Sequence, residues 1–150
     1  MSPSPTESPS DSTGPPDRQT LALLERQLAT DSLVADTRFE PNAYEPHLLR
    51  ASLDASQYPA PTESARLDLR WFASGDFSIH YVERDSSGSQ WECRWDRHPN
   101  DHDARLHFHR PPDGDEVEDL SLPSLHPLEV YSTVLTAVEQ RLEAQWATDQ

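Results

Sequence analysis

The sequence contains no lysine: all 12 of its basic residues are arginine, set against 27 acidic residues and a formal net charge of −15. An acidic chain without lysine is typical of proteins that stay soluble at very high salt, so we expect a halophilic protein. The alternative is an ordinary acidic protein that binds cationic partners. At molar salt the Debye length falls to about 3 Å. The net charge therefore does not exclude an anionic partner, as it would at low salt.

Cysteine, glycine and long apolar runs are also scarce. The single cysteine, Cys93, excludes an intrachain disulfide, and its alternation with Trp91 and Trp95 predicts a buried thiol. Four glycines can hardly form a glycine-rich phosphate loop, and no run of about 18 apolar residues could span a membrane. Because the N-terminus lacks the basic and apolar regions of a signal peptide, we expect a cytoplasmic protein that does not bind membranes.

The chain divides by composition into a tail and one domain. Residues 1–16 are mainly serine, proline and threonine, with no apolar residue after Met1. Such a segment cannot bury apolar surface, so we predict a disordered tail over residues 1–16. The remaining residues, 17–150, are enough for a single domain.

The domain shows helical periodicity at its two ends and strand-like alternation between them. Helices are expected over residues 17–29 and 126–146, and strands over 33–40, 47–54, 65–71, 77–82, 91–96 and 105–109. The strand over 47–54 is expected at an edge because prolines surround it. The short turns around Gly75 and Gly88 make successive strands antiparallel neighbours. The predicted fold class is α+β: an antiparallel meander of about four to six strands with both helices packed on one face.

Residues 91–112 concentrate the side chains that could carry chemistry. They hold four of the seven histidines: His98, His102, His107 and His109. His107 and His109 alternate with Leu106 and Phe108, so in a strand they share a face and lie roughly 7 Å apart. Two neighbouring imidazoles with Asp96 nearby suit either acid–base chemistry or metal binding.

The first hypothesis is cleavage of an RNA phosphodiester. His107 and His109 would act as acid and base, since an imidazole titrates near neutral pH, and Asp96 would orient one of the rings. The substrate would be held by the remaining polar side chains of the segment: Arg94, Arg97, Arg110, His98 and His102.

Two other hypotheses remain open. Some of the four histidines and Asp96 could bind a divalent transition metal, structurally or for metal-assisted hydrolysis; no other cofactor is expected. Alternatively the chain is a non-catalytic interaction module whose histidines lie on the polar face of an edge strand. Neither hypothesis excludes a homodimer.

Three short motifs follow one another in this segment: Arg94-Trp95-Asp96, His98-Pro99 and His107-Phe108-His109-Arg110-Pro111. An acidic loop and an amphipathic helix come after them. This order resembles the TumE-type toxin family of toxin–antitoxin systems over residues 65–142. The resemblance implies a toxin with an RNA target, active residues at His107 and His109, the aspartate at Asp96, and a cognate antitoxin as partner.

Overall fold

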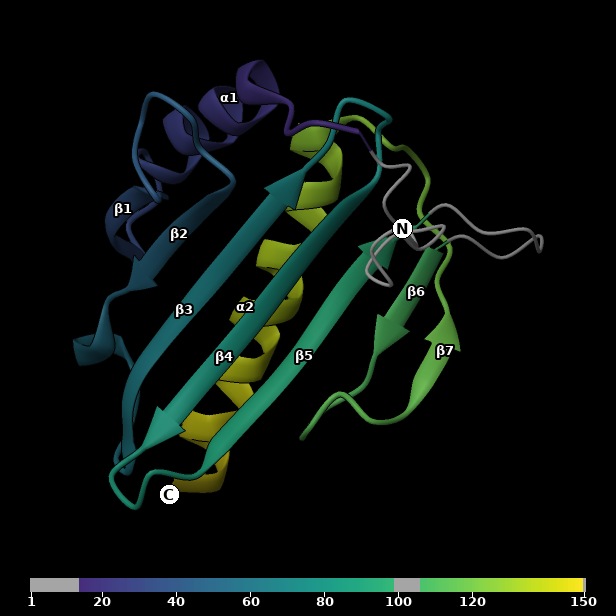
Figure 1. Ribbon diagram of the computed structural model, residues 1–150. Helices are drawn as coiled ribbons and strands as arrows, with labels where there is room; N and C mark the ends of the chain where they lie inside the picture. The colour runs from purple at the N-terminus through teal and green to yellow at the C-terminus, as the bar shows by residue number, and fades with distance from the viewer. Residues whose placement is uncertain (1–13, 99–105, 150) are drawn as a thin grey trace, which may run out of the picture.

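The computed structural model describes residues 14–98 and 106–149 of the chain. Within those residues, an antiparallel sheet of seven strands forms one layer and two helices form the other (Figure 1). The strands are β1 (Val34–Glu40), β2 (Leu48–Leu53), β3 (Thr62–Trp71), β4 (Phe77–Asp85), β5 (Gln90–Arg97), β6 (Leu106–His109) and β7 (Val117–Asp119). Their order across the sheet is their order along the chain. The predicted α+β meander is therefore confirmed.

The strand count exceeds the expected four to six because of β7, which lies in a segment expected to be an acidic loop. All three residues of β7 are exposed. Its sequence, Val-Glu-Asp, shows no alternation of apolar and polar residues that would predict a strand. The strand forms through backbone pairing with β6. Local patterning could not have predicted it.

The second strand was expected at an edge of the sheet, and that prediction is wrong. β2 pairs with β1 on one side and with β3 on the other. The prolines that suggested an edge, Pro41, Pro46 and Pro59, all lie outside Leu48–Leu53. Every residue of β2 therefore keeps the backbone N–H that an interior strand needs.

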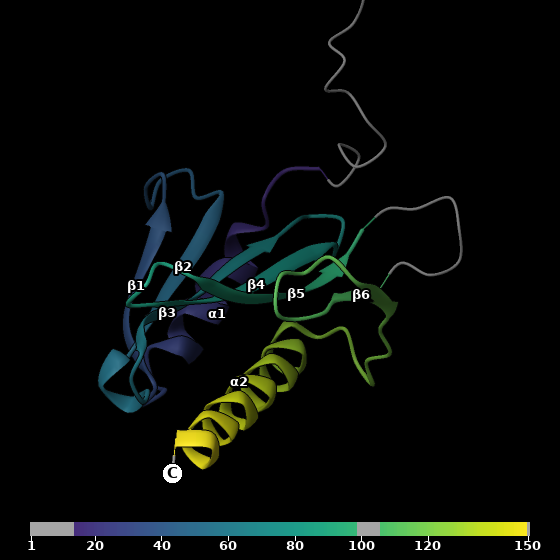
Figure 2. The same ribbon diagram turned by 90° about the horizontal axis from the view of Figure 1, so that it is seen from below.

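Both helices lie on the same face of the sheet, as predicted (Figure 2). α1 (Arg18–Leu28) begins after Asp17, whose carboxylate accepts a hydrogen bond from the Thr20 amide at 3.1 Å and caps the first turn. α2 (Pro127–Asp149) begins with a proline, which is favoured at the first helical position. In Figure 1, α2 runs behind β3, β4 and β5. No described helix is long and apolar enough to cross a membrane.

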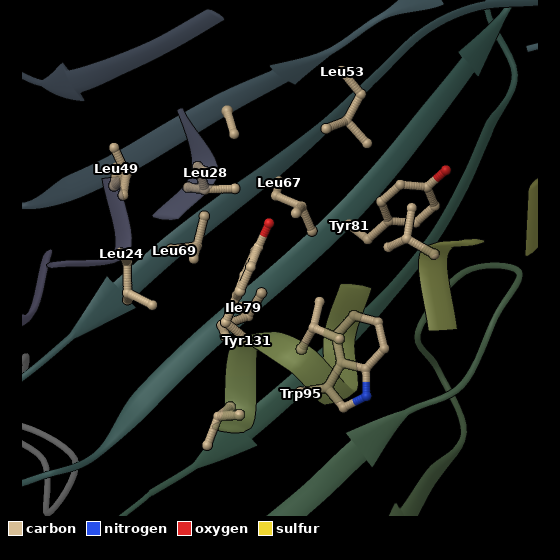
Figure 3. Packing of buried hydrophobic residues seen from close by; sticks show 14 of the residues in the cluster. Leu24, Leu28, Leu49, Leu53, Leu67, Leu69, Ile79, Tyr81, Trp95 and Tyr131 are labelled. Atoms are coloured by element: carbon tan, nitrogen blue, oxygen red, sulfur yellow. The ribbon is translucent and has the colours of Figure 1, made fainter. Parts of the chain in front are cut away.

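The apolar side chains of the strands meet those of the helices in one core (Figure 3). Its members include Leu24, Leu28, Leu49, Leu67, Leu69, Ile79, Tyr81, Trp95 and Tyr131. Removing apolar surface from water stabilises the fold by roughly 25 cal/mol per Å², which decides which side of each strand turns toward the helices. The alternate residues point to the opposite side, which we call the helix-free face; it carries Asp68, His80, Arg94, Asp96 and His109.

The predicted tail, residues 1–16, falls almost entirely outside the described residues. Of its last residues, Pro15 accepts a backbone hydrogen bond from Ala73 at 2.8 Å, and Pro16 forms a β-bridge with Phe72. Pro15 and Pro16 are therefore held against the β3–β4 turn. A disordered tail before these residues and a single domain after them stay predictions.

Candidate functional site

One row of charged and histidine side chains crosses the helix-free face over six strands. In register, from β1 to β6, the row consists of Arg38, Arg50, Asp68, His80, Arg94 and His109. Residues directly opposite each other in antiparallel strands point to the same face and have neighbouring Cβ atoms. Side chains scattered over some 70 positions of the sequence are thus brought side by side.

The candidate site lies at the β5–β6 end of this row, and Asp96 of β5 is at its centre. Its side chain is fully buried, and its Oδ2 atom contacts three other side chains. Arg94 Nε donates to it at 2.8 Å, His98 Nε2 lies at 3.1 Å, and His109 Nε2 lies at 2.7 Å. We call these four residues the Asp96 cluster. Within the described part of the chain, the other carboxylate oxygen, Oδ1, is buried and accepts no hydrogen bond.

The Asp96 cluster keeps its carboxylate ionised. Burial by itself would raise the pKa of Asp96, but the hydrogen bond from His98 and the charge of Arg94 outweigh it, so the pKa lies below its ordinary value. The same hydrogen bond raises the pKa of His98, although partial burial opposes it. Asp96 is therefore a fixed negative charge that can orient an imidazole and stabilise its protonated form.

The structure brings His107 close to this cluster but does not join it to the carboxylate. His107 shares the helix-free face with His109, as the alternation predicts, and lies in register with Asp96 on one side and Asp119 on the other. Among the described residues, its partly buried ring has no hydrogen-bond or ion-pair partner. Asp96 is bonded to His109 instead.

Two of the predicted substrate-binding arginines lie away from the cluster. Arg97 faces the helix side in register with Phe77, and its Nη1 atom donates to the buried carboxylate of Asp76 at 2.8 Å. Arg110 alternates with Phe108 and lines an apolar groove between the sheet and α2, where it pairs with glutamates of the β7 region. Of the three predicted arginines, Arg94 therefore belongs to the Asp96 cluster. The predicted substrate-binding His102 lies outside the described residues.

The structure also adds a pair that the sequence analysis missed. His80 Nε2 on β4 lies 2.7 Å from Glu92 Oε1 on β5, and both side chains are partly accessible to solvent. His80 is directly opposite Arg94. The alternation of residues 77–82 already places His80 on the polar face, but only the register of β4 against β5 places it beside Arg94.

The chain matches a known protein family over most of its length. A family model described as Toxin TumE matches residues 22–142. The chain belongs to the TumE toxin family. The matched segment runs from α1 into α2 and contains the whole sheet, so the resemblance inferred from the motifs over residues 94–111 is confirmed. A toxin family of toxin–antitoxin systems implies an antitoxin partner. Neither a curated protein nor a solved structure matches the chain.

A second polar cluster lies on the other face of the sheet, inside the core of this TumE-family protein. Tyr81 Oη donates to Glu83 Oε2 at 2.6 Å and contacts Tyr58 Oη at 2.7 Å. From α2, Arg141 donates to both carboxylate oxygens of Glu83, at 2.9 and 3.0 Å. Its guanidinium also stacks on Trp91, 3.8 Å from the ring centroid. This cluster fastens α2 to the sheet.

Cys93 lies beside this inner cluster and is buried, as predicted. Burial raises the pKa of its thiol to about 12, so the thiol stays protonated near neutral pH. A thiol is a weak nucleophile compared with a thiolate. Cys93 therefore belongs to the core and not to a catalytic site.

Metal binding was the second hypothesis for the histidines. In residues 14–98 and 106–149, no group of three or more histidine, cysteine, aspartate or glutamate side chains is arranged to hold a metal ion. Among the described residues, two histidines, His98 and His109, contact the same carboxylate oxygen.

Proposed function

We propose that this TumE-family toxin is a ribonuclease that cleaves RNA by histidine acid–base catalysis on the helix-free face. The observation that supports this most is the contact of His109 with the buried, ionised Asp96, 2.7 Å apart, beside an arginine that is 40% exposed. A carboxylate that orients an imidazole and a cation that can bind phosphate are the groups that phosphodiester cleavage requires.

The reaction needs no group beyond these side chains and the RNA. One histidine accepts the proton of the ribose 2′-hydroxyl, and the 2′-oxygen forms a bond to phosphorus. The bond from phosphorus to the 5′-oxygen breaks as a second histidine protonates that oxygen. The products are a 2′,3′-cyclic phosphate and a free 5′-hydroxyl. Arg94 binds the phosphate and stabilises the charge that gathers on its oxygens.

We assign one proton transfer to His109, with Asp96 as the orienting carboxylate. The sequence-based hypothesis assigns the other transfer to His107, which lies on the same face. Phosphate binding is assigned to Arg94, with His98 beside it. The positions of Arg97 and Arg110 do not support a role for them in the same site.

We also propose that the toxin acts in the cytoplasm of a halophilic cell, where its RNA target and its antitoxin occur together. The absence of lysine among 12 basic residues and the charge of −15 support this. In a thermal unfolding series from about 0.2 M to about 3 M KCl, the midpoint should rise, because salt screens the repulsion between acidic side chains. A midpoint that does not respond to KCl would contradict the halophilic origin.

A non-catalytic or metal-binding module is the alternative. It is favoured by one observation: two histidine Nε2 atoms lie within 3.1 Å of the same carboxylate oxygen, and imidazole and carboxylate are common zinc ligands. In this case the cluster would bind a divalent transition metal and stabilise the fold or an interface.

One experiment separates the two functions. Purified protein in molar KCl is incubated with RNA, with and without EDTA, as wild type, as His109→Ala and as His47→Ala. His47 is exposed in the β1–β2 loop and serves as the control. We expect cleavage that resists EDTA, falls by about 10²- to 10⁴-fold in His109→Ala and is unchanged in His47→Ala. Activity abolished by EDTA would show that cleavage depends on a metal ion and would reject metal-free acid–base catalysis. No cleavage by folded wild type would reject the ribonuclease and favour the non-catalytic module.

A further inference from the structure

A second histidine–carboxylate pair lies on the helix-free face, on the other side of Arg94. His80 of β4 is in register with Arg94 of β5, which is in register with His109 of β6. Each of the two histidines contacts its own carboxylate at 2.7 Å: Glu92 for His80 and Asp96 for His109. The arrangement is an arginine flanked by two imidazoles, each oriented by an acid.

The spacing suits one phosphodiester lying over Arg94. Strands in a sheet are about 4.8 Å apart, so the Cβ atoms of His80 and His109, two strands apart, are separated by roughly 10 Å. Nη2 of Arg94 lies 3.1 Å from Nε2 and 3.5 Å from Nδ1 of His109, so a phosphate would bind on the solvent side of the guanidinium, which is 40% exposed. Both rings are accessible to a ligand, since the side chains of His80 and His109 are 29% and 17% exposed.

Transfer at phosphorus favours His80 over His107 as the second catalytic histidine. The attacking and leaving oxygens lie roughly in line, on opposite sides of phosphorus, so the base and the acid must approach from opposite sides. His80 and His109 lie on opposite sides of Arg94. His107 and His109 are neighbours on one strand, on the same side of Arg94, and His107 has no carboxylate partner among the described residues.

The groups around His80 leave its ring available for proton transfer. Glu92 accepts the hydrogen of Nε2, so in the neutral ring Nδ1 is the nitrogen that accepts a proton. On the other side of His80 lies Asp68, which could compete for the ring. Arg50 and Arg66 already bind the carboxylate of Asp68, at 2.8 and 3.2 Å. Glu92 is therefore the acid that holds His80.

We propose that His80, oriented by Glu92, is a catalytic residue that transfers one of the two protons while His109 transfers the other. Arg94 holds the scissile phosphate between them. The inference rests on the proposed ribonuclease function. In the cleavage step one of these histidines takes the 2′-hydroxyl proton, and the other gives its proton to the 5′-oxygen as the bond from phosphorus to that oxygen breaks.

The first test compares single variants on a ribo-oligonucleotide in molar KCl: His80→Ala, His80→Gln, His109→Ala, His107→Ala and the control His47→Ala. Rates are expressed per folded molecule, with circular dichroism and a melting curve for each variant. Both His80 variants and His109→Ala should lose about 100-fold or more, His107→Ala should lose less than about tenfold, and His47→Ala should match wild type. His80→Gln keeps a polar side chain of similar size, so a loss there is not a packing defect.

The second test divides the roles between the two histidines. The same RNA is prepared with sulfur replacing the 5′-oxygen at the mapped cleavage site, because a thiolate leaves without being protonated. The variant that lacks the general acid should recover most of its rate on this substrate, and the variant that lacks the general base should not. Recovery of both variants, or of neither, would overturn the division of roles.

The outcomes keep this inference separate from the proposed function. Full activity of both His80 variants together with loss in His109→Ala would reject His80 and leave the ribonuclease standing. The same result with a large loss in His107→Ala would return the second proton transfer to His107. If folded wild type does not cleave RNA, both the function and the inference are wrong.

Discussion

His109 Nε2 lies 2.7 Å from Oδ2 of Asp96, a carboxylate completely removed from solvent. The two residues come from different strands, β5 and β6. They meet because Asp96 lies two residue pairs along from the pair formed by Arg94 and His109, and therefore on the same face of the sheet. A buried charge is stable only when it is paired and hydrogen-bonded. The site and the stability of this end of the sheet therefore depend on the same carboxylate.

Asp96→Asn tests that dependence. The amide keeps the shape of the side chain but removes the charge that holds Arg94, His98 and His109, so we expect cleavage to fall by about 100-fold or more. Loss of charge-assisted hydrogen bonds should lower the free energy of unfolding by about 1–3 kcal/mol. Urea unfolding and RNA cleavage of the same preparation measure both effects. Asp36→Asn, at an exposed position of β1, is the control and should change neither quantity.

The His98–Asp96 contact predicts a dependence of stability on pH. The pKa of His98 is raised above 6.5 in the folded protein, so its stabilising contribution is complete below pH 6.5 and is lost as the pH rises through the folded value. The pKa of Asp96 is lowered from 3.8, so its contribution is present above that pH and is lost as the pH falls through the folded value.

The measurement is the difference in unfolding free energy between wild type and His98→Ala from pH 4 to pH 9, which cancels the titration of the other groups. The difference should be largest between about pH 4 and pH 6.5 and should shrink at higher pH. A difference that grows as the pH rises above 7 would show that His98 is not stabilised by Asp96.

Glu83→Gln probes the inner cluster and should separate stability from activity. Glu83 is buried and binds Arg141 through both carboxylate oxygens. Removing one partner of a buried ion pair costs about 3–5 kcal/mol, so the variant should melt far below wild type. Because Glu83 faces the helices, cleavage per folded molecule should stay unchanged. The exposed Glu118→Gln is the matched control for stability.

Cys93 provides a prediction about reactivity. With its pKa raised to about 12 by burial, the thiol of the folded protein should not react with Ellman's reagent at pH 8 and should react fully in denaturant. Cys93→Ser places a hydroxyl in the same buried position and should cost about 1–3 kcal/mol of unfolding free energy. Fast labelling of the native protein would contradict the burial of Cys93.

Several features of the site follow from strand alternation. Cys93 and Trp95 share the core-facing side with Arg97, and Phe108 shares it with Arg110. The same alternation that correctly predicted a buried Cys93 thus also separates Arg97 and Arg110 from Asp96, His107 and His109. The sequence therefore already contains the signal that separates these two arginines from the site.

Other features could not be predicted locally. The three residues of β7 show no alternation of buried and exposed side chains, since all of them are exposed. Only its backbone pairing with β6 makes this segment a strand. The position of His80 opposite Arg94 depends on where the turn between β4 and β5 sets the register. A shift of one residue would turn one of these side chains to the other face.

The sequence by itself determined the helices, most of the strands, the buried thiol and the family, because these depend on periodicity and on short motifs that neighbouring residues carry. Only the tertiary structure decided that Asp96 binds His109 and not His107, and that His80 with Glu92 lies beside Arg94. Those contacts join residues 12 to 14 positions apart across paired strands. The register of the sheet fixes them, and register is a property of the whole assembled fold.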